Sequence, residues 1–205
     1  MSYILRLDCS PRQSDSHSRY IADSIEKQLL KLQPQLQIKN RDLSLGDIPV
    51  ISEQTISGFY ATASAMTAEL IDATALSDEL ISEINNATFI IIATPMYNFS
   101  VPAALKAWID QIVRINRTFA YDGTQFTGLV PVKQAYLALA YGAAGYAPGG
   151  DFATMNFLEP YLQSLLTFLG IENTHTFRLE GTTGDAANIA SAKQSLQTRI
   201  AQAVV

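Results

Sequence analysis

Hydrophobic positions along this chain follow two alternating patterns, short apolar runs and stripes at helical spacing. The run Tyr3–Asp8 has the composition of a β-strand, and after a Ser-rich turn apolar residues recur at helical spacing from Tyr20 to Leu32. Residues Thr88–Ala93 form a continuous apolar run, which is typical of a parallel strand buried on both faces. These segments predict a first strand, a first helix and the central strand of a sheet.

The same alternation fills the rest of the chain, except for Gly46–Ser64, which has no readable pattern. Five strands that alternate with helices predict a parallel sheet with right-handed crossovers. The expected fold is an α/β doubly wound five-stranded parallel sheet in a three-layer αβα domain. The further strands are predicted at Gln37–Asp42, Gln134–Tyr141 and Thr174–Leu179, and the further helices at Leu70–Ile84, Leu105–Val113, Phe157–Phe168 and Ala186–Val204.

Composition favours a single globular domain over residues 1–205. Hydrophobic residues make up 48% of the chain and charged residues 16%, and no Pro-, Gly- or Ser-rich linker divides it. The net charge of −5 and the lack of clustered Lys and Arg argue against nucleic acid as a partner. The low charged fraction also suggests an additional buried surface, such as an interface between subunits.

Cysteine usage and the length of the apolar runs limit the possible sites. Cys9 is the single cysteine, so an intramolecular disulfide, a thiolate zinc site and a CxxC redox pair are excluded. A cytoplasmic location fits this, and the N-terminus runs straight into a strand pattern without a signal sequence. The longest apolar runs are far shorter than the roughly 20 residues of a membrane-spanning helix. We expect neither a metal site nor membrane association.

The loops after the strands indicate where a ligand would bind, because open parallel sheets bind ligands beyond the carboxyl ends of their strands. The loop Ser10–Ser18 lacks both the GxGxxG and the GxxxxGK[ST] fingerprints. It offers hydroxyl groups at a helix N-terminus, where free backbone N–H groups and the helix dipole favour an anion. A monophosphate fits this description, although Ser14, Ser16 and Ser18 could instead only cap the helix.

Two further loops are expected at the same edge of the sheet. Thr94–Ser100 combines a stiff proline, aromatic side chains and an amide, which suits a planar ring with polar edges such as an isoalloxazine. An aromatic loop that anchors itself to the core would have the same composition. Ala140–Gly145 places small residues where a backbone must approach a ring closely, as would any tight turn.

These loops and their neighbours resemble the FMN-dependent NADH-azoreductase family of flavodoxin-like quinone reductases. The likeness covers nearly the whole chain and is strongest in the loop after the central strand. Its matching segments are Thr94–Phe99, Pro102–Asp110, Thr118–Tyr121, Gly128–Leu129 and Phe168–Ile171.

The resemblance implies a set of cofactor-binding positions for FMN. The residues expected at the phosphate are Ser10, Ser16, His17 and Ser18, and His17 is expected to contribute its backbone N–H rather than its ring. The residues expected to contact the flavin ring lie in two loops. The first supplies Pro95, Met96, Tyr97, Asn98 and Phe99, and the second supplies Ala140, Tyr141, Gly142 and Ala143.

The second ring loop departs from better-known members of that family. They carry a hydroxyl and two glycines where this chain has Ala140, Gly142 and Ala143. Contacts there are therefore expected from the backbone, with Gly142 as the residue that needs an unusual backbone angle. The resemblance also places Phe119 and Tyr121 near the substrate, with a reach across a dimer or simple local packing as the alternatives.

The activity implied is an NAD(P)H-dependent reduction of quinones to hydroquinones and of aromatic azo compounds to amines. NADH or NADPH would pass a hydride to N5 of FMN and leave, and the acceptor would then take two electrons in a ping-pong mechanism. No catalytic side chain is expected, and a homodimer is. The alternative is a flavodoxin-like FMN electron carrier without this activity, and the mild acidity of the chain argues against it.

Overall fold

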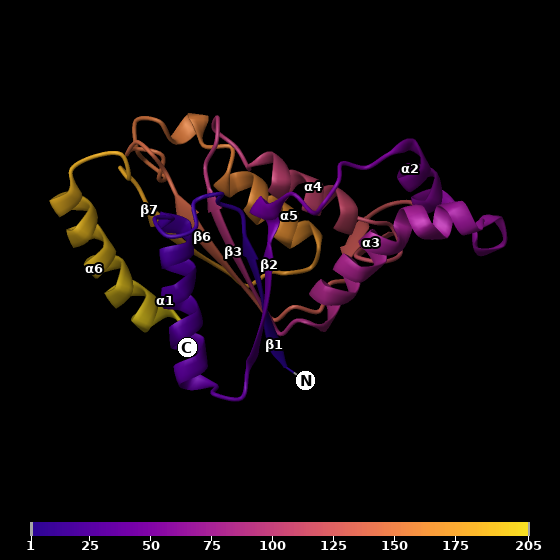
Figure 1. Ribbon diagram of the computed structural model, residues 1–205, viewed down its shortest axis with the longest axis horizontal. Coiled ribbons are helices and arrows are strands. Elements are labelled where there is room, and N and C mark those ends of the chain that lie inside the picture. The colour runs from indigo at the N-terminus through magenta and orange to yellow at the C-terminus, as the bar shows by residue number, and fades with distance from the viewer. Residues whose placement is uncertain (1, 205) are drawn as a thin grey trace.

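The computed structural model describes residues 2–204 and has a five-stranded parallel sheet at its centre (Figure 1). Met1 and Val205, which the predicted domain of residues 1–205 includes, lie outside the described residues. The strands lie in the order β2-β1-β3-β6-β7. Their bounds are β1 (Tyr3–Asp8), β2 (Gln37–Asp42), β3 (Phe89–Pro95), β6 (Gln134–Ala140) and β7 (Thr174–Leu179). The doubly wound α/β fold predicted from the sequence is confirmed.

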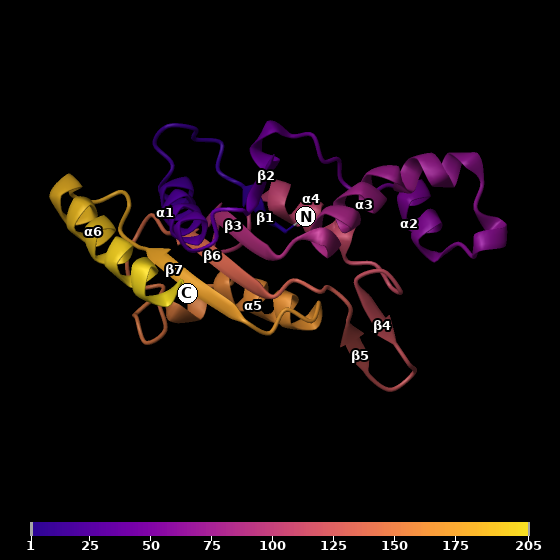
Figure 2. The ribbon, with the colours of Figure 1, turned by 90° about the horizontal axis from the view of Figure 1, so that it is seen from below.

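Helices cover both faces of the sheet and give the three layers. Helices α1 and α6 pack together on one face, and α3, α4 and α5 lie on the other (Figures 1 and 2). The helices are α1 (His17–Leu32), α2 (Glu53–Tyr60), α3 (Ala68–Asn86), α4 (Ala103–Ile112), α5 (Glu159–Phe168) and α6 (Ala186–Ala203), with short 3-10 turns η1 (Leu43–Leu45), η2 (Ala63–Ala65) and η3 (Ala153–Met155).

Strand β1 shows how the alternation of side chains builds two cores. Leu5 and Leu7 pack into the cluster under α3, α4 and α5, whereas Ile4 packs under α1 and α6. Because side chains alternate along a strand, Arg6 and Asp8 share the face of Ile4 and point toward α1. Both are buried, so the α1 face carries charged groups at the carboxyl end of its core.

The segment without a readable pattern forms a short helix, α2, that packs against α3. Its start has a capping box, in which the side chains of Ser52 and Thr55 each accept a hydrogen bond from the other's backbone N–H. Gly58 allows the close approach, since a Cβ there would lie 2.5 Å from Thr74 Cγ2. Helix α2 and the start of α3 project from the body of the molecule (Figures 1 and 2). Local capping and one glycine carry little hydrophobic signal, which explains the missing prediction.

The helix predicted over Phe157–Phe168 begins only at Glu159. The backbone N–H of Phe157 donates to the Phe99 carbonyl outside the helix. The N–H groups of Leu158 and Glu159 donate to Asn156 Oδ1, both at 3.2 Å. A side-chain acceptor therefore sets the start of α5 two residues later than the apolar pattern indicates.

An antiparallel hairpin of β4 (Phe119–Tyr121) and β5 (Phe126–Gly128) lies beside α5. The ring of Phe119 is 4.9 Å from that of Phe168, centroid to centroid. Helix α5 leads from the carboxyl end of β6 to the amino end of β7, so Phe168 marks the amino-terminal edge of the sheet. The hairpin is placed at that edge (Figure 2).

Candidate functional site

A pocket opens at the carboxyl ends of β1, β3, β6 and β7, where the loops of these strands meet. Open parallel sheets place their ligand sites at this edge. Its lining residues are Ser10, Arg12, Asp15, Ser16, His17, Ser18, Pro95, Met96, Tyr97, Ala140, Gly142, Thr182 and Thr183. The pocket thus unites nine of the predicted cofactor-binding residues, from all the loops that the sequence indicated.

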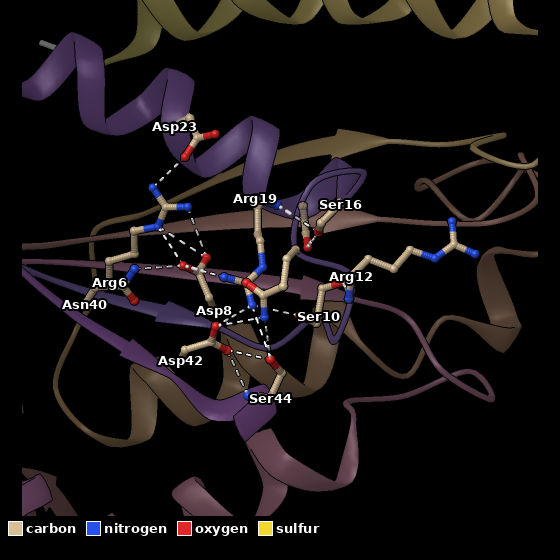
Figure 3. Close-up of polar contacts among 12 residues, drawn as sticks. Arg6, Asp8, Ser10, Arg12, Ser16, Arg19, Asp23, Asn40, Asp42 and Ser44 are labelled. Carbon is tan, nitrogen blue, oxygen red and sulfur yellow. Dashed lines mark hydrogen bonds and ion pairs between the residues drawn. The ribbon is translucent and has the colours of Figure 1, made fainter. Parts of the chain in front are cut away.

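The hydroxyl end of the pocket is the start of α1 (Figure 3). Ser16 is the N-cap of this helix, and its Oγ accepts a hydrogen bond from the Arg19 N–H at 3.3 Å. The Ser16 and Ser18 hydroxyls are 3.2 Å apart, and the Ser10 hydroxyl accepts from the Arg12 N–H. The first turn contains no acidic residue. Capping and pocket lining are therefore joint roles of Ser16, and Ser14 lies outside this pocket.

His17 is the first residue of α1 and lines the pocket. Burial lowers its pKa, and the nearby charges of Lys193 and Arg12 lower it further. Its Nδ1 is buried without a hydrogen-bond partner among residues 2–204. A neutral ring with an unused polar atom thus stands beside the free backbone N–H groups of the helix start.

The loop after β3 reverses direction in a tight turn from Tyr97 to Ser100. The backbones of these two residues exchange hydrogen bonds of 3.0 and 3.1 Å. Asn98 and Phe99 between them have φ values of 47° and 72°, as the central residues of a type I′ turn do. Asn tolerates this conformation well, whereas an aromatic residue rarely adopts it. Such strain is retained where the surrounding structure or a function requires it.

The loop after β6 is held to the loop after β7. The N–H and hydroxyl of Thr182 both donate to the Tyr141 carbonyl, and those of Thr183 donate to the Gly142 carbonyl. Gly142 lies outside the left-handed region, so the expectation that it needs an unusual backbone angle was wrong. Within Ala140–Gly145 the residue with a positive φ is Gly145, at 98°. Packing against the β7 loop, which the sequence does not reveal, allows Gly142 an ordinary conformation.

Some predicted residues lie apart from the pocket. Asn98 and Phe99 form the exposed tip of the turn, and Ala143 is exposed. The Tyr141 side chain points into the core, where Asn156 donates a hydrogen bond to its hydroxyl. Phe119 and Tyr121 lie in the hairpin at the amino-terminal edge, away from this pocket. Within one chain the structure does not bring Phe119 and Tyr121 to the site.

Four lining residues were not predicted: Arg12, Asp15, Thr182 and Thr183. Arg12 and Asp15 belong to the loop that the sequence singled out for its serines. Thr182 and Thr183 follow β7, a predicted strand whose carboxyl end faces the same edge. The rule that indicated the other loops applies equally to this one, so topology was the signal that could have found it.

Comparison with known proteins supports this fold. A family model described as a flavodoxin-like fold matches residues 2–202. The FMN-dependent NADH:quinone oxidoreductase of Xanthobacter autotrophicus is 46% identical over 173 residues, which cover 84% of this chain and 83% of that protein. The chain belongs to this family of flavodoxin-like quinone oxidoreductases. The resemblance predicted from the sequence is thereby confirmed.

Other members of the quinone oxidoreductase family match over almost their whole length. The FMN-dependent NADH:quinone oxidoreductase 1 of Pseudomonas fluorescens is 36% identical over 96% of this chain and 97% of its own. An azoreductase structure from Bacillus anthracis has a TM-score of 0.89 at 21% identity, and it covers 100% of this chain and 99% of its own. That likeness establishes the fold of the oxidoreductase independently of close sequence identity.

Three further features of this oxidoreductase concern metal binding, membrane spanning and its cysteine. Residues 2–204 contain no cluster of three or more His, Cys, Asp or Glu side chains that could hold a metal ion. No helix within those residues is long and apolar enough to cross a membrane. Cys9 is buried, and burial together with the charge of Asp8 raises the pKa of its thiol. It therefore packs as a small apolar residue rather than as a reactive thiolate.

The residues of the pocket fit FMN. One end presents the hydroxyls of Ser10, Ser16 and Ser18 to a helix N-terminus, which suits a terminal phosphate. The other walls are the apolar and aromatic side chains of Pro95, Met96 and Tyr97. The unpartnered Nδ1 of His17 adds a polar atom that an anionic or carbonyl group could use. A planar ring with a phosphorylated tail matches both ends.

Proposed function

We propose that this protein binds FMN in the pocket at the carboxyl ends of β1, β3, β6 and β7 and uses NADH or NADPH to reduce quinones to hydroquinones. The single observation that carries the proposal is the pocket itself, which joins a hydroxyl-lined helix N-terminus to apolar ring walls. Relatives with up to 46% identity are named FMN-dependent NADH:quinone oxidoreductases, and one from Pseudomonas aeruginosa is named an NAD(P)H enzyme.

Reductive cleavage of aromatic azo compounds belongs to the same proposal. A structural neighbour from Bacillus anthracis, with a TM-score of 0.85, is described as an FMN-dependent NADH-azoreductase in complex with FMN. The chemistry that FMN supplies when bound is acceptance of a hydride from NAD(P)H and two-electron reduction of an acceptor, in ping-pong order. An azo bond requires two such rounds for its cleavage to amines.

The chain's own residues bind and orient the cofactor. The hydroxyls of Ser10, Ser16 and Ser18 and the first N–H groups of α1 would hold the phosphate. The side chains of Pro95–Tyr97 would flank the ring, and Asn98 would reach its polar edge from the turn. The backbone at Ala140–Gly142 would approach the ring opposite them. No side chain of the pocket is needed as a nucleophile or acid, since protons can come from solvent.

Binding measurements test the cofactor assignment. FMN should bind more tightly than riboflavin by orders of magnitude, because several charge-assisted hydrogen bonds of roughly 1.5–3 kcal/mol each go to the phosphate. FMN should also be preferred to FAD, since the loop has no adenylate fingerprint. Equal affinity for FMN and riboflavin would contradict the anion site. A steady-state NAD(P)H:quinone assay separates an enzyme from an electron carrier, which would show no such turnover.

We also propose a homodimer in which the flavin lies near the interface. Large apolar side chains are exposed on α2 and just before it, with Tyr60 76% and Val50 80% exposed. The exposed aromatic residues Tyr121 and Phe126 of the hairpin could then reach a partner's pocket. Sedimentation at enzymatic concentrations is the test, and a fully active monomer at high dilution would rule the dimer out.

We also propose a cytoplasmic location and a single folding domain. The single cysteine supports a cytoplasmic location. One central sheet with a core on each face supports a single folding domain over residues 1–205. A single cooperative thermal transition, with equal calorimetric and van't Hoff enthalpies, is the expected sign of one domain.

A further inference from the structure

Arg19, in the first turns of α1, connects the phosphate loop to buried carboxylates of the sheet (Figure 3). Its Nη2 donates to the Ser10 carbonyl oxygen at 2.8 Å and to Asp42 Oδ2 at 2.8 Å. Its Nη1 forms an ion pair with Asp8 Oδ2 at 3.2 Å. One guanidinium thus joins the ends of β1 and β2 to the backbone of the loop.

The partners of Arg19 are themselves fixed. Asp8 is fully buried and also receives the Arg6 guanidinium and the Asn40 amide. Asp42 accepts from the Ser44 hydroxyl and the Ser44 N–H. Burial opposes ionisation of Asp42, but the hydrogen bonds from Ser44 and Arg19 outweigh it and lower its pKa. Both carboxylates are therefore held in place by several hydrogen-bond donors.

The contact to Ser10 is the part of this network that reaches the site. A planar guanidinium with several fixed partners allows only one orientation, so it fixes the direction of the Ser10 carbonyl. Ser10 lines the pocket, and its side-chain hydroxyl accepts a hydrogen bond from the Arg12 N–H. Arg19 itself is absent from the pocket lining. Its influence on a ligand is exerted through the loop.

We propose that Arg19 is a positioning residue, which sets the phosphate loop in its binding conformation before the cofactor arrives. This rests on the proposed function, since the phosphate that the loop would receive is that of FMN. Preorganised donors bind an anion more tightly because less ordering is needed on binding. Loss of Arg19 should therefore reduce the affinity for the phosphate group and leave contacts to the ring largely intact.

Arg6 provides a matched control within the same network. It pairs with the same Asp8, at 3.1 Å, and its other partners Asp23 and Glu26 lie on α1. Its recorded hydrogen bonds among residues 2–204 go to those carboxylates and to no residue of the Ser10–Ser18 loop. A variant of Arg6 therefore removes a buried cation at Asp8 without removing the contact to Ser10.

The test compares FMN and riboflavin binding to Arg19→Gln, Arg6→Gln and wild type. Arg19→Gln should lower FMN affinity by about tenfold or more and change riboflavin affinity much less. Arg6→Gln should lower the melting temperature of the FMN-free protein and keep the ratio of the two affinities. Arg19→Lys should restore the ratio only in part, since a single ammonium cannot span the same partners. An unchanged ratio in Arg19→Gln would overturn the proposal.

Amide hydrogen exchange gives a readout without cofactor. Exchange at the loop before α1 should be faster in FMN-free Arg19→Gln than in Arg6→Gln, and equal rates would count against the proposal. If Arg19→Gln does not fold, Asp42→Asn weakens the same anchor more gently and should lower the FMN-to-riboflavin ratio in the same direction. If Asp42→Asn leaves the FMN-to-riboflavin affinity ratio unchanged, the proposal for Arg19 is overturned. Failure of the wild type to bind FMN would instead refute the proposed function.

Discussion

The loops on the two sides of the pocket are held by single charged side chains of opposite sign. Arg19 holds the loop after β1 by donating to the Ser10 carbonyl. Glu180, which follows β7, holds the loop after β6 by accepting the N–H groups of Gly145, Tyr146 and Ala147 at 3.3, 2.8 and 2.7 Å. One loop is anchored through a carbonyl group and the other through N–H groups.

This difference is consistent with the proposed ligand of each loop. A loop that binds an anion must keep its N–H groups free, because an acceptor that already occupied them would compete with the ligand. An arginine on a carbonyl leaves the N–H groups available. The loop after β6 faces no such limit, because its proposed task is a close backbone approach to a ring. Its N–H groups are bound by Glu180 and its carbonyls by Thr182 and Thr183.

The largest effect is expected from breaking the Glu180 anchor. Glu180→Ala leaves the N–H groups of residues 145–147 without their carboxylate, and the free energy of unfolding should fall by about 2 kcal/mol. Chemical denaturation of the FMN-free protein measures this. Glu172→Ala is the matched control, because Glu172 is exposed and no hydrogen bond or ion pair is recorded for it within residues 2–204. Equal stability of the two variants would show that the anchor contributes nothing.

A smaller effect is expected at the turn Tyr97–Ser100, for which no hydrogen bond to a charged side chain is recorded within residues 2–204. Asn98→Ala should lower the stability of the FMN-free protein by roughly 1 kcal/mol, because alanine disfavours a φ of 47°, and Asn98→Gly should not. Both should weaken FMN binding in a fluorescence titration if the amide contacts the flavin. Unchanged affinity, with a lower melting temperature for Asn98→Ala alone, would assign Asn98 to loop architecture.

The smallest effect concerns His17, which lines the pocket together with residues of both loops. Burial, Lys193 and Arg12 lower its pKa in the folded protein, so the unfolded chain takes up this proton first as the pH falls. The stability that neutral His17 contributes is present above its unfolded pKa of about 6.5 and is lost as the pH falls through its folded pKa. Melting temperatures of wild type and His17→Gln should therefore diverge between about pH 7 and 5, and parallel curves would contradict this.

The candidate site was predictable where one loop carries its own signal. Hydroxyls before a helix and aromatic residues after a buried strand are local patterns, and Ser10, Ser16, Ser18 and Met96 are together in the pocket. The anchors of these loops were not predictable. Arg19 and Asp42 are 23 residues apart, and Glu180 contacts a loop more than 30 residues before it. No short-range pattern distinguishes these charges from solvated ones.

The sequence by itself determined the fold and the edge of the sheet where the site lies, because hydrophobic periodicity is a local property and strand order follows from the connections between elements. Tertiary structure alone decided which charges are buried and paired. Arg6 and Asp8 have the pattern of ordinary polar positions in a strand, and packing against α1 buries both. Tertiary structure also decided that Gly142 lies outside the left-handed region and that Gly145 has a positive φ. Such choices depend on neighbours distant in sequence, which compete for the same hydrogen bonds and space.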